Sequence, residues 1–158
     1  MKLFNLAAIS LFSLWLQGCG QVEFMTSLKI SSDFTNAEIE QITRAADAWC
    51  DASVACWDAE IVEPYHANIK KLTERPSDWP DARIGYTAQL IGRGGRVLGP
   101  LWVGILAGDD IECVAMHELG HVYGANGHAD EPGHVMSAVS TGCENGITEK
   151  DIKLVKSN

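Results

Sequence analysis

The chain has 158 residues, of which 46% are hydrophobic, so it is long enough for one domain with its own apolar core. Its formal net charge is −9, and its 12 lysines and arginines form no basic run, which argues against a nucleic-acid partner. We expect one acidic domain that binds no nucleic acid and is a monomer.

The first 18 residues have the pattern of a signal peptide. An apolar run from Leu3 to Leu16 follows Lys2 and is too short to cross a membrane comfortably as a helix. The run continues as Gln17-Gly18-Cys19, and this junction resembles the lipobox of bacterial lipoproteins, although Gln17 stands where a small residue is usual. The resemblance implies that Cys19 becomes the lipidated first residue of the mature protein. The alternative is an ordinary signal peptide followed by an incidental cysteine.

This interpretation divides the chain into a signal peptide (1–18), a lipidated tether (19–26) and a folded domain (27–158). By the same resemblance, Gly20 in place of an aspartate after the cysteine favours the outer membrane of a bacterial cell envelope. We therefore expect a protein anchored to the membrane through its lipid, with the domain facing the periplasm or the exterior.

Four cysteines remain after Cys19, and an even number in an exported protein favours two disulfides. Of the three possible pairings we expect Cys50–Cys56, which closes a short loop after a helix, and Cys113–Cys143. A metal site made of cysteines is the alternative, and the lack of a Cys-x-x-Cys pair in the sequence argues against it.

In the first half of the domain, residues 28–31 are predicted to form a strand. Thr35 or Asn36 then caps a helix that runs to about Cys50, because apolar residues recur at helical spacing as far as Trp49. Residues 59–62 are predicted as a second strand. The stretch 64–81 contains three prolines and many polar residues, so most of it is expected to be loop.

In the second half, residues 83–91 alternate as a strand and 97–106 form a further apolar strand. Asp109 or Asp110 is expected to cap a helix that ends at Gly124. Residues 125–146 are expected to be irregular, and Thr148 to cap a last short helix. The order predicts an α+β domain with a twisted mixed sheet on one side.

Residues 117–128 read His-Glu-Leu-Gly-His-Val-Tyr-Gly-Ala-Asn-Gly-His and carry the predicted chemistry. On a helix, His117 and His121 lie on one face and suit two ligands of a tetrahedral zinc. Glu118 is then placed beside the metal and not on it. Gly124 provides a turn, and His128 is the candidate third ligand.

This motif, together with Val135-Met136-Ser137, resembles the metzincin metalloproteases, most closely their matrixin-like branch. In that family a methionine in a tight turn, the Met-turn, follows the third histidine, and Met136 stands at the matrixin interval from His128. The resemblance implies a zincin/metzincin-like domain with one catalytic Zn²⁺ and a protein or peptide substrate. The substrate would lie antiparallel to an edge strand, here expected at 84–90.

The sequence departs from the family by one residue, because the family pattern would place the third histidine where this chain has Gly127. A one-residue insertion in the turn after Gly124 accounts for the shift, since glycine and asparagine tolerate positive φ. His134 is the alternative third ligand, and Glu144 or Glu149 is a weaker one.

The motif predicts a zinc-dependent endopeptidase. Glu118 would take a proton from a zinc-bound water as it attacks the peptide carbonyl, and would pass that proton to the leaving amine. No pro-segment is expected, so export, access or an inhibitor would limit activity. The alternative is a non-catalytic zinc-binding envelope lipoprotein that binds a partner, which the irregular histidine spacing favours and the presence of Glu118 opposes.

Overall fold

The computed structural model describes residues 24–52, 54–58, 66–77, 85–88, 101–108, 110–138 and 143–157. The predicted signal peptide, Cys19 and most of the predicted tether lie outside these residues. The helices and strands are, in chain order, β1 (Phe24–Ile30), α1 (Asn36–Asp51), β2 (Ala55–Asp58), β3 (His66–Leu72), β4 (Gly85–Ala88), β5 (Leu101–Leu106), α2 (Ile111–Val122) and α3 (Glu149–Lys156). Within the described residues, no helix is long and apolar enough to span a membrane.

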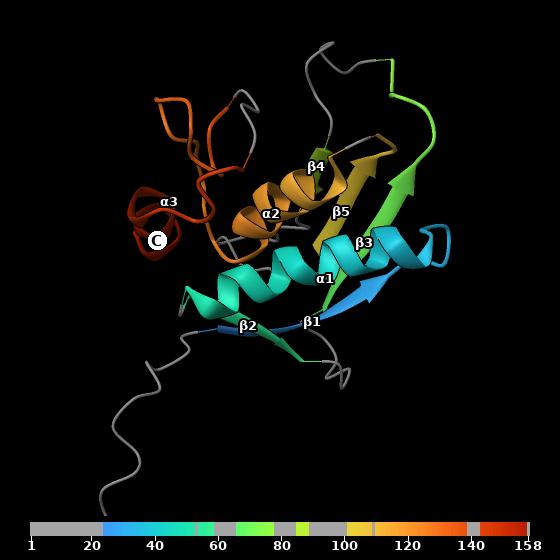
Figure 1. Ribbon diagram of the computed structural model, residues 1–158, viewed down its shortest axis with the longest axis horizontal. Coiled ribbons are helices and arrows are strands. Elements are labelled where there is room, and N and C mark those ends of the chain that lie inside the picture. The colour runs from blue at the N-terminus through green and yellow to red at the C-terminus, as the bar shows by residue number, and fades with distance from the viewer. Residues whose placement is uncertain are drawn as a thin grey trace, which may run out of the picture.

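The five described strands form one mixed sheet in the order β2-β1-β3-β5-β4 (Figure 1). β1 pairs in parallel with β2 and β3, β3 pairs in parallel with β5, and β4 is antiparallel to β5. The antiparallel strand β4 is therefore at one edge of the sheet, next to the strand that leads into α2.

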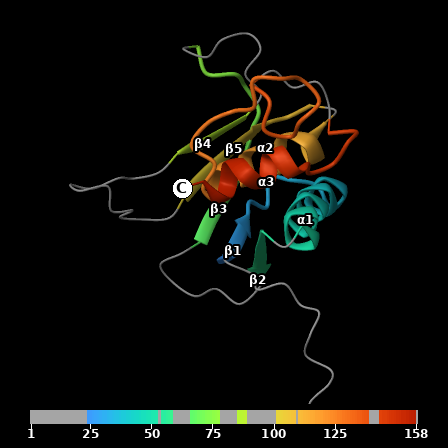
Figure 2. The same cartoon turned by 90° about the vertical axis from the view of Figure 1, so that its left-hand side faces the viewer.

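α1 and α2 cover the same face of the sheet, as two views at right angles show (Figures 1 and 2). The buried side chains of β3 and β5, Ile69, Val103 and Ile105, point towards the helices, while Trp102 points to the opposite face and is partly exposed. The helices also contact each other directly, because the Nε1–H of Trp49 in α1 donates to the carbonyl oxygen of Met116 in α2 at 2.9 Å.

α1 begins where the sequence predicts. The hydroxyl of Thr35 accepts from the Glu38 amide at 3.3 Å, and the Glu38 carboxylate accepts from the Thr35 amide at 2.7 Å, which completes a capping box. The Glu38 carboxylate also accepts from Lys71 of β3 at 2.7 Å, and this hydrogen bond is the main cause of the lowered pKa of Glu38.

The prediction that residues 64–81 are mostly loop is wrong for its first half, because β3 occupies His66–Leu72 at the centre of the sheet. Its helix-facing side carries only two buried apolar residues, Ala67 and Ile69, followed by Lys71. The apolar alternation is therefore too short to mark a strand, and the neighbouring prolines favour a loop in the sequence.

Two other strands also differ from the prediction. β1 begins at Phe24, four residues before the predicted strand and inside the segment 19–26 predicted as a tether. The second strand is at Ala55–Asp58, whereas the predicted 59–62 lies outside the described residues. β4 and β5 cover the described parts of the last two predicted strands.

Both predicted disulfides are confirmed. Cys50 at the end of α1 is bonded to Cys56 in β2, and Cys113 in the first turn of α2 is bonded to Cys143 in the segment before α3. The second disulfide closes a sequence separation of 30 residues and so restricts the unfolded chain more than the first, which closes 6. It also fixes one end of the irregular segment that follows α2.

Candidate metal centre

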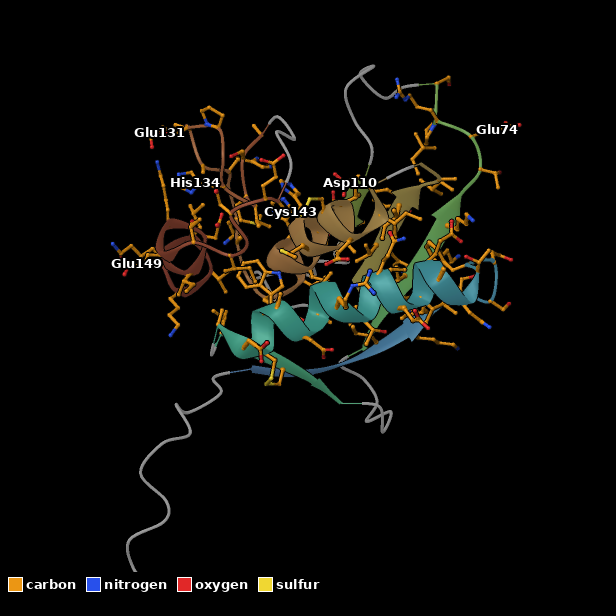
Figure 3. All side chains as sticks on the ribbon, viewed as in Figure 1. Glu74, Asp110, Glu131, His134, Cys143 and Glu149 are labelled. Atoms are coloured by element: carbon orange, nitrogen blue, oxygen red, sulfur yellow. A yellow bond between two sulfur atoms is a disulfide. The ribbon has the colours of Figure 1, made fainter. Side chains whose placement is uncertain are left out.

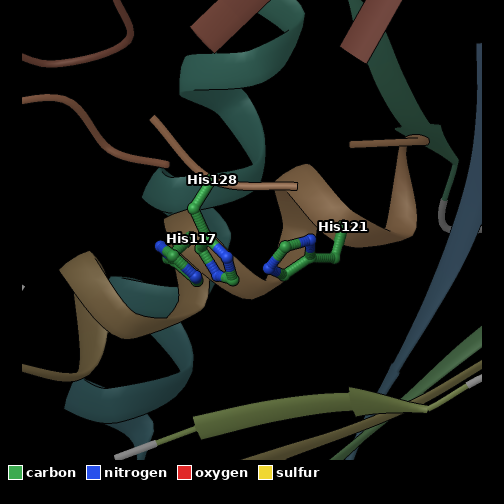
Figure 4. Close-up of side chains that lie close together, drawn as sticks. All are labelled: His117, His121 and His128. Atoms are coloured by element: carbon green, nitrogen blue, oxygen red, sulfur yellow. The ribbon is translucent and has the colours of Figure 1, made fainter. Parts of the chain in front are cut away.

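Three histidines, two on α2 and one on the segment that follows it, lie close together. The ring nitrogens of His117, His121 and His128 that could serve as ligands all lie within 4.8 Å of one another. The ring centroids are 5.0 to 5.1 Å apart, and the three rings gather around one point (Figure 4). His117 and His121 are half-buried and His128 is exposed, so the group is open to solvent on one side.

Two of these rings are oriented by backbone carbonyls. Nδ1 of His117 is 2.7 Å from the carbonyl oxygen of Val135, and Nδ1 of His121 is 2.7 Å from that of Ala125. Since a carbonyl can only accept, each Nδ1 carries the proton, which leaves Nε2 unprotonated and able to bind a metal. A group of three imidazoles, two of them oriented in this way, fits zinc, whose ligands in proteins are commonly histidine nitrogens.

The segment that carries His128 is fixed to the segment that carries Met136. The Ala129 amide donates to the Met136 carbonyl oxygen at 2.7 Å, and Ala129 and Ser137 form an isolated bridge. Met136 itself is fully buried against α2 at Gly120, where a Cβ atom would lie far too close to the Met136 sulfur. Gly120 therefore allows Met136 to pack directly beneath the helix that carries His117 and His121.

The turn at Met136 is also fixed to α3. The Asp151 side chain is fully buried, and its Oδ1 accepts from the Met136 amide at 2.8 Å. Its Oδ2 accepts from the amide and the hydroxyl of Thr148, at 2.8 and 2.6 Å. One carboxylate thus completes the capping box of α3 and holds the turn beneath the three histidines.

Replacing Asp151 with alanine should lower the free energy of unfolding by about 2–3 kcal/mol, because buried donors at Met136 and Thr148 would lose their acceptor. Urea unfolding of the two proteins measures this difference. Asp51→Ala is the matched control: Asp51 is exposed at the end of α1, so its loss should change stability by about 0.5 kcal/mol or less. Equal effects of the two substitutions would contradict a structural role for Asp151.

Glu118 is the one carboxylate of the motif, and only 5% of its surface is accessible. It extends from α2 towards the edge strand β4, where the hydroxyl of Thr87 donates to its Oε2 at 2.7 Å. Glu118 therefore lies on the same helix as His117 and His121 but is not a member of the three-histidine group.

His134 lies away from the three histidines. Its Nδ1 is 2.8 Å from the Thr148 hydroxyl, and its Nε2 is 3.8 Å from the Glu131 carboxylate (Figure 3). Among the described residues, the groups that could hold a metal include neither His134 nor Glu144 nor Glu149. A second group of Asp110, Cys113 and Cys143 does occur, but its two sulfurs form a disulfide and so offer no thiolate.

The turn between α2 and His128 begins at Gly124, and Gly127 within it does not adopt the positive φ expected for the extra residue. Gly124 has φ +120°, which ends the helix in a conformation that other residues rarely adopt. Tyr123, just before it, is buried against Trp49 with ring centroids 6.0 Å apart, and burial raises its pKa. Tyr123 is therefore part of the core.

The pKa of His117 is lowered from its ordinary value of 6.5 to about 4, chiefly by burial and also by the neighbouring His121 and His128, against the hydrogen bond to Val135. The folded state of the metal-free protein thus resists protonation at this ring, whereas the unfolded chain accepts a proton below pH 6.5. The contribution of His117 to the free energy of unfolding is therefore fully present above pH 6.5 and is lost as the pH decreases towards 4.

We expect this histidine to remove roughly 3 kcal/mol of stability from the metal-free protein between pH 7 and pH 4. Urea unfolding of wild type and His117→Gln across this range isolates the contribution, since other groups titrate in both proteins. The stability advantage of wild type over the variant should shrink as the pH falls. A difference that stays constant with pH would contradict the lowered pKa.

Sequence reasoning did not identify Thr87, Asp151 or Gly120 as parts of this centre. Asp151 carried one usable signal, since it stands three residues after Thr148 in the spacing of a capping box. Thr87 and Gly120 become significant only through contacts between elements that are distant in the sequence, with Glu118 and Met136 respectively.

No family model matches the sequence, and none of the curated proteins is similar enough in sequence to match. Among solved structures, the fold is similar to that of high choriolytic enzyme 1, a hatching enzyme zinc-protease from the medaka fish Oryzias latipes. The TM-score is 0.54 at 14% sequence identity, and the likeness covers 94% of this chain and 96% of that chain. The predicted α+β, zincin/metzincin-like fold is therefore confirmed.

Proposed function

We propose that the protein is a zinc-dependent endopeptidase. The observation that carries the proposal is the group of His117, His121 and His128 on and after one helix, with Glu118 buried on that same helix. The fold shared with a zinc protease supports it, although a likeness at 14% identity concerns the fold and not the activity. Assignment to the matrixin-like branch rests on the interval from His128 to Met136.

The three histidines would hold the metal through ring nitrogens, and the Val135 and Ala125 carbonyls keep those of His117 and His121 free of protons. Zinc, when bound, would supply a Lewis acid that polarises a peptide carbonyl and makes water acidic enough to react near neutral pH. Glu118 would accept the proton from the attacking water and return it to the leaving amine.

The edge strand β4 offers a place for an extended substrate. Among the described strands it pairs on one side only, with β5, and a peptide could add to its other side through backbone hydrogen bonds. Thr87 on β4 contacts Glu118, so a peptide on this edge would pass close to the proposed base. The substrate class this favours is an extended polypeptide.

The cellular location proposed here is the bacterial envelope, with Cys19 as the lipid anchor. The sequence 16–19 is the support for this, since these residues lie outside the described part of the chain. Mass spectrometry of the mature N-terminal peptide tests it: a diacylated or triacylated Cys19 is expected, and an unmodified peptide that begins elsewhere would overturn it.

Metal removal tests the proposed activity. The full chain in mild detergent should cleave internal bonds of an unstructured protein such as casein, and a zinc chelator should reduce the rate at least about a hundredfold. Stoichiometric Zn²⁺ should restore the rate, and Mg²⁺ or Ca²⁺ should not, because these ions prefer oxygen ligands. A chelator-resistant rate, or no cleavage at one bound zinc per chain, would overturn the proposal.

A further inference from the structure

One contact joins the proposed base to the edge strand. The hydroxyl of Thr87 in β4 is 2.7 Å from Oε2 of Glu118 and 3.0 Å from the Glu118 carbonyl oxygen. A hydroxyl has one proton to donate, and the carboxylate oxygen is the nearer of the two acceptors. The carboxylate oxygen Oε2 therefore receives the hydrogen bond, and Thr87 fixes the end of an otherwise flexible side chain.

The backbone of β4 is shaped to permit this contact. Gly85 lies two residues before Thr87, on the same face of the strand. A Cβ atom at Gly85 would lie 2.7 Å from Oε1 of Glu118 and 2.8 Å from Cγ1 of Val114, closer than real Cβ atoms approach. The absence of a side chain at Gly85 makes room for one carboxylate oxygen, and Thr87 binds the other.

Thr87 has no role in the metal site itself, because the three histidines lie on α2 and on the segment that follows it. Its hydroxyl acts on Glu118 alone among the contacts that the structure describes for it. It also belongs to the strand on which an extended peptide is proposed to lie.

We infer that Thr87 is a positioning residue for the proposed peptidase, holding the Glu118 carboxylate in the orientation needed to accept a proton. The inference rests on the proposed function and adds that two elements are needed for the base: α2 carries Glu118, and β4 orients its carboxylate. A gain of about tenfold in turnover is in keeping with one hydrogen bond to a charged group.

The test compares Thr87→Val, which removes the hydroxyl, with Thr87→Ser, which keeps it, in the zinc-loaded full chain. Thr87→Val should lower kcat about tenfold with KM changed less than about twofold, and Thr87→Ser should restore most of the rate. Thr43→Val is the matched control, since the Thr43 hydroxyl on α1 donates only to the Ile39 carbonyl at 2.9 Å, and its loss should leave kcat unchanged.

A binding measurement supplies a readout that needs no turnover. A peptide hydroxamate presents a proton that the Glu118 carboxylate can accept, so its affinity should fall several-fold in Thr87→Val. In a Glu118→Ala background the same substitution should have no further effect, because Thr87 would have nothing left to orient. A zinc dissociation constant that is unchanged in Thr87→Val separates this effect from loss of metal.

The outcomes separate the inference from the function on which it rests. An active wild type whose kcat and hydroxamate affinity are unaffected by Thr87→Val would overturn the role of Thr87 and leave the peptidase in place. Additive losses in the Glu118→Ala background would also overturn it, because Thr87 would then act by another route. A zinc-loaded wild type that neither cleaves peptides nor binds the hydroxamate would overturn both.

Discussion

Replacing Glu118 with alanine should lower the rate of peptide cleavage about a thousandfold while zinc remains bound. The reason is that Glu118 lies beside the three histidines in sequence and on the same helix, but is not one of the group that could hold a metal. Removing it takes away the group that moves the proton and leaves the ligands intact. Steady-state rates with a quenched fluorescent peptide, together with zinc content, measure both effects.

Glu112→Ala is the matched control for this substitution. Glu112 lies on the same helix, and its carboxylate pairs with Arg44 at 2.8 Å on the surface. Exposed pairs of this kind contribute little to stability, so the variant should keep nearly the full rate. If Glu118→Ala with a full complement of zinc cleaved the peptide as fast as wild type, Glu118 would not be the base.

Replacing His128 with alanine should weaken zinc binding at least about a hundredfold, since loss of a group that only orients a ligand already costs about ten- to a hundredfold. His134→Ala should change the zinc affinity by no more than a few-fold, because the His134 ring faces Thr148 and Glu131 and not His117. Competition with a chromophoric chelator measures both dissociation constants. The opposite ranking of the two variants would make His134 the third ligand.

The helices of this fold and the location of its motif could be predicted from the sequence because each rests on local signals. Thr35 and Thr148 have capping partners three residues on, and Gly124 ends α2 at a positive φ. Both disulfides were also predictable, since the four cysteines that follow Cys19 have only three ways to form two pairs.

The central strand β3 could not be predicted, because its place depends on two parallel neighbours, β1 and β5, that are distant in the sequence. In the sequence, Lys71 favours a loop. In the structure it is half-buried in β3, because it donates a hydrogen bond to the Glu38 carboxylate of α1 at 2.7 Å. The strand is stabilised by pairing with these neighbours, which the local sequence does not predict.

The same distinction applies to the candidate site. His117, Glu118 and His121 follow from helical spacing, and the interval to Met136 favours His128. The groups that surround them come from elsewhere: Thr87 from β4, and Asp151 from α3 by way of the turn at Met136. Such contacts depend on tertiary packing, which no spacing rule within one segment encodes.

A crystal structure of the zinc-loaded protein, with the metal located by anomalous scattering, would show directly whether the three histidines form a catalytic zinc site. We expect one zinc bound by nitrogens of His117, His121 and His128 at about 2.0–2.1 Å, with the fourth position open to solvent and Glu118 next to it. A fourth protein ligand that closes the tetrahedron, from His134 or a carboxylate, would mark the zinc as structural and contradict the proposed peptidase.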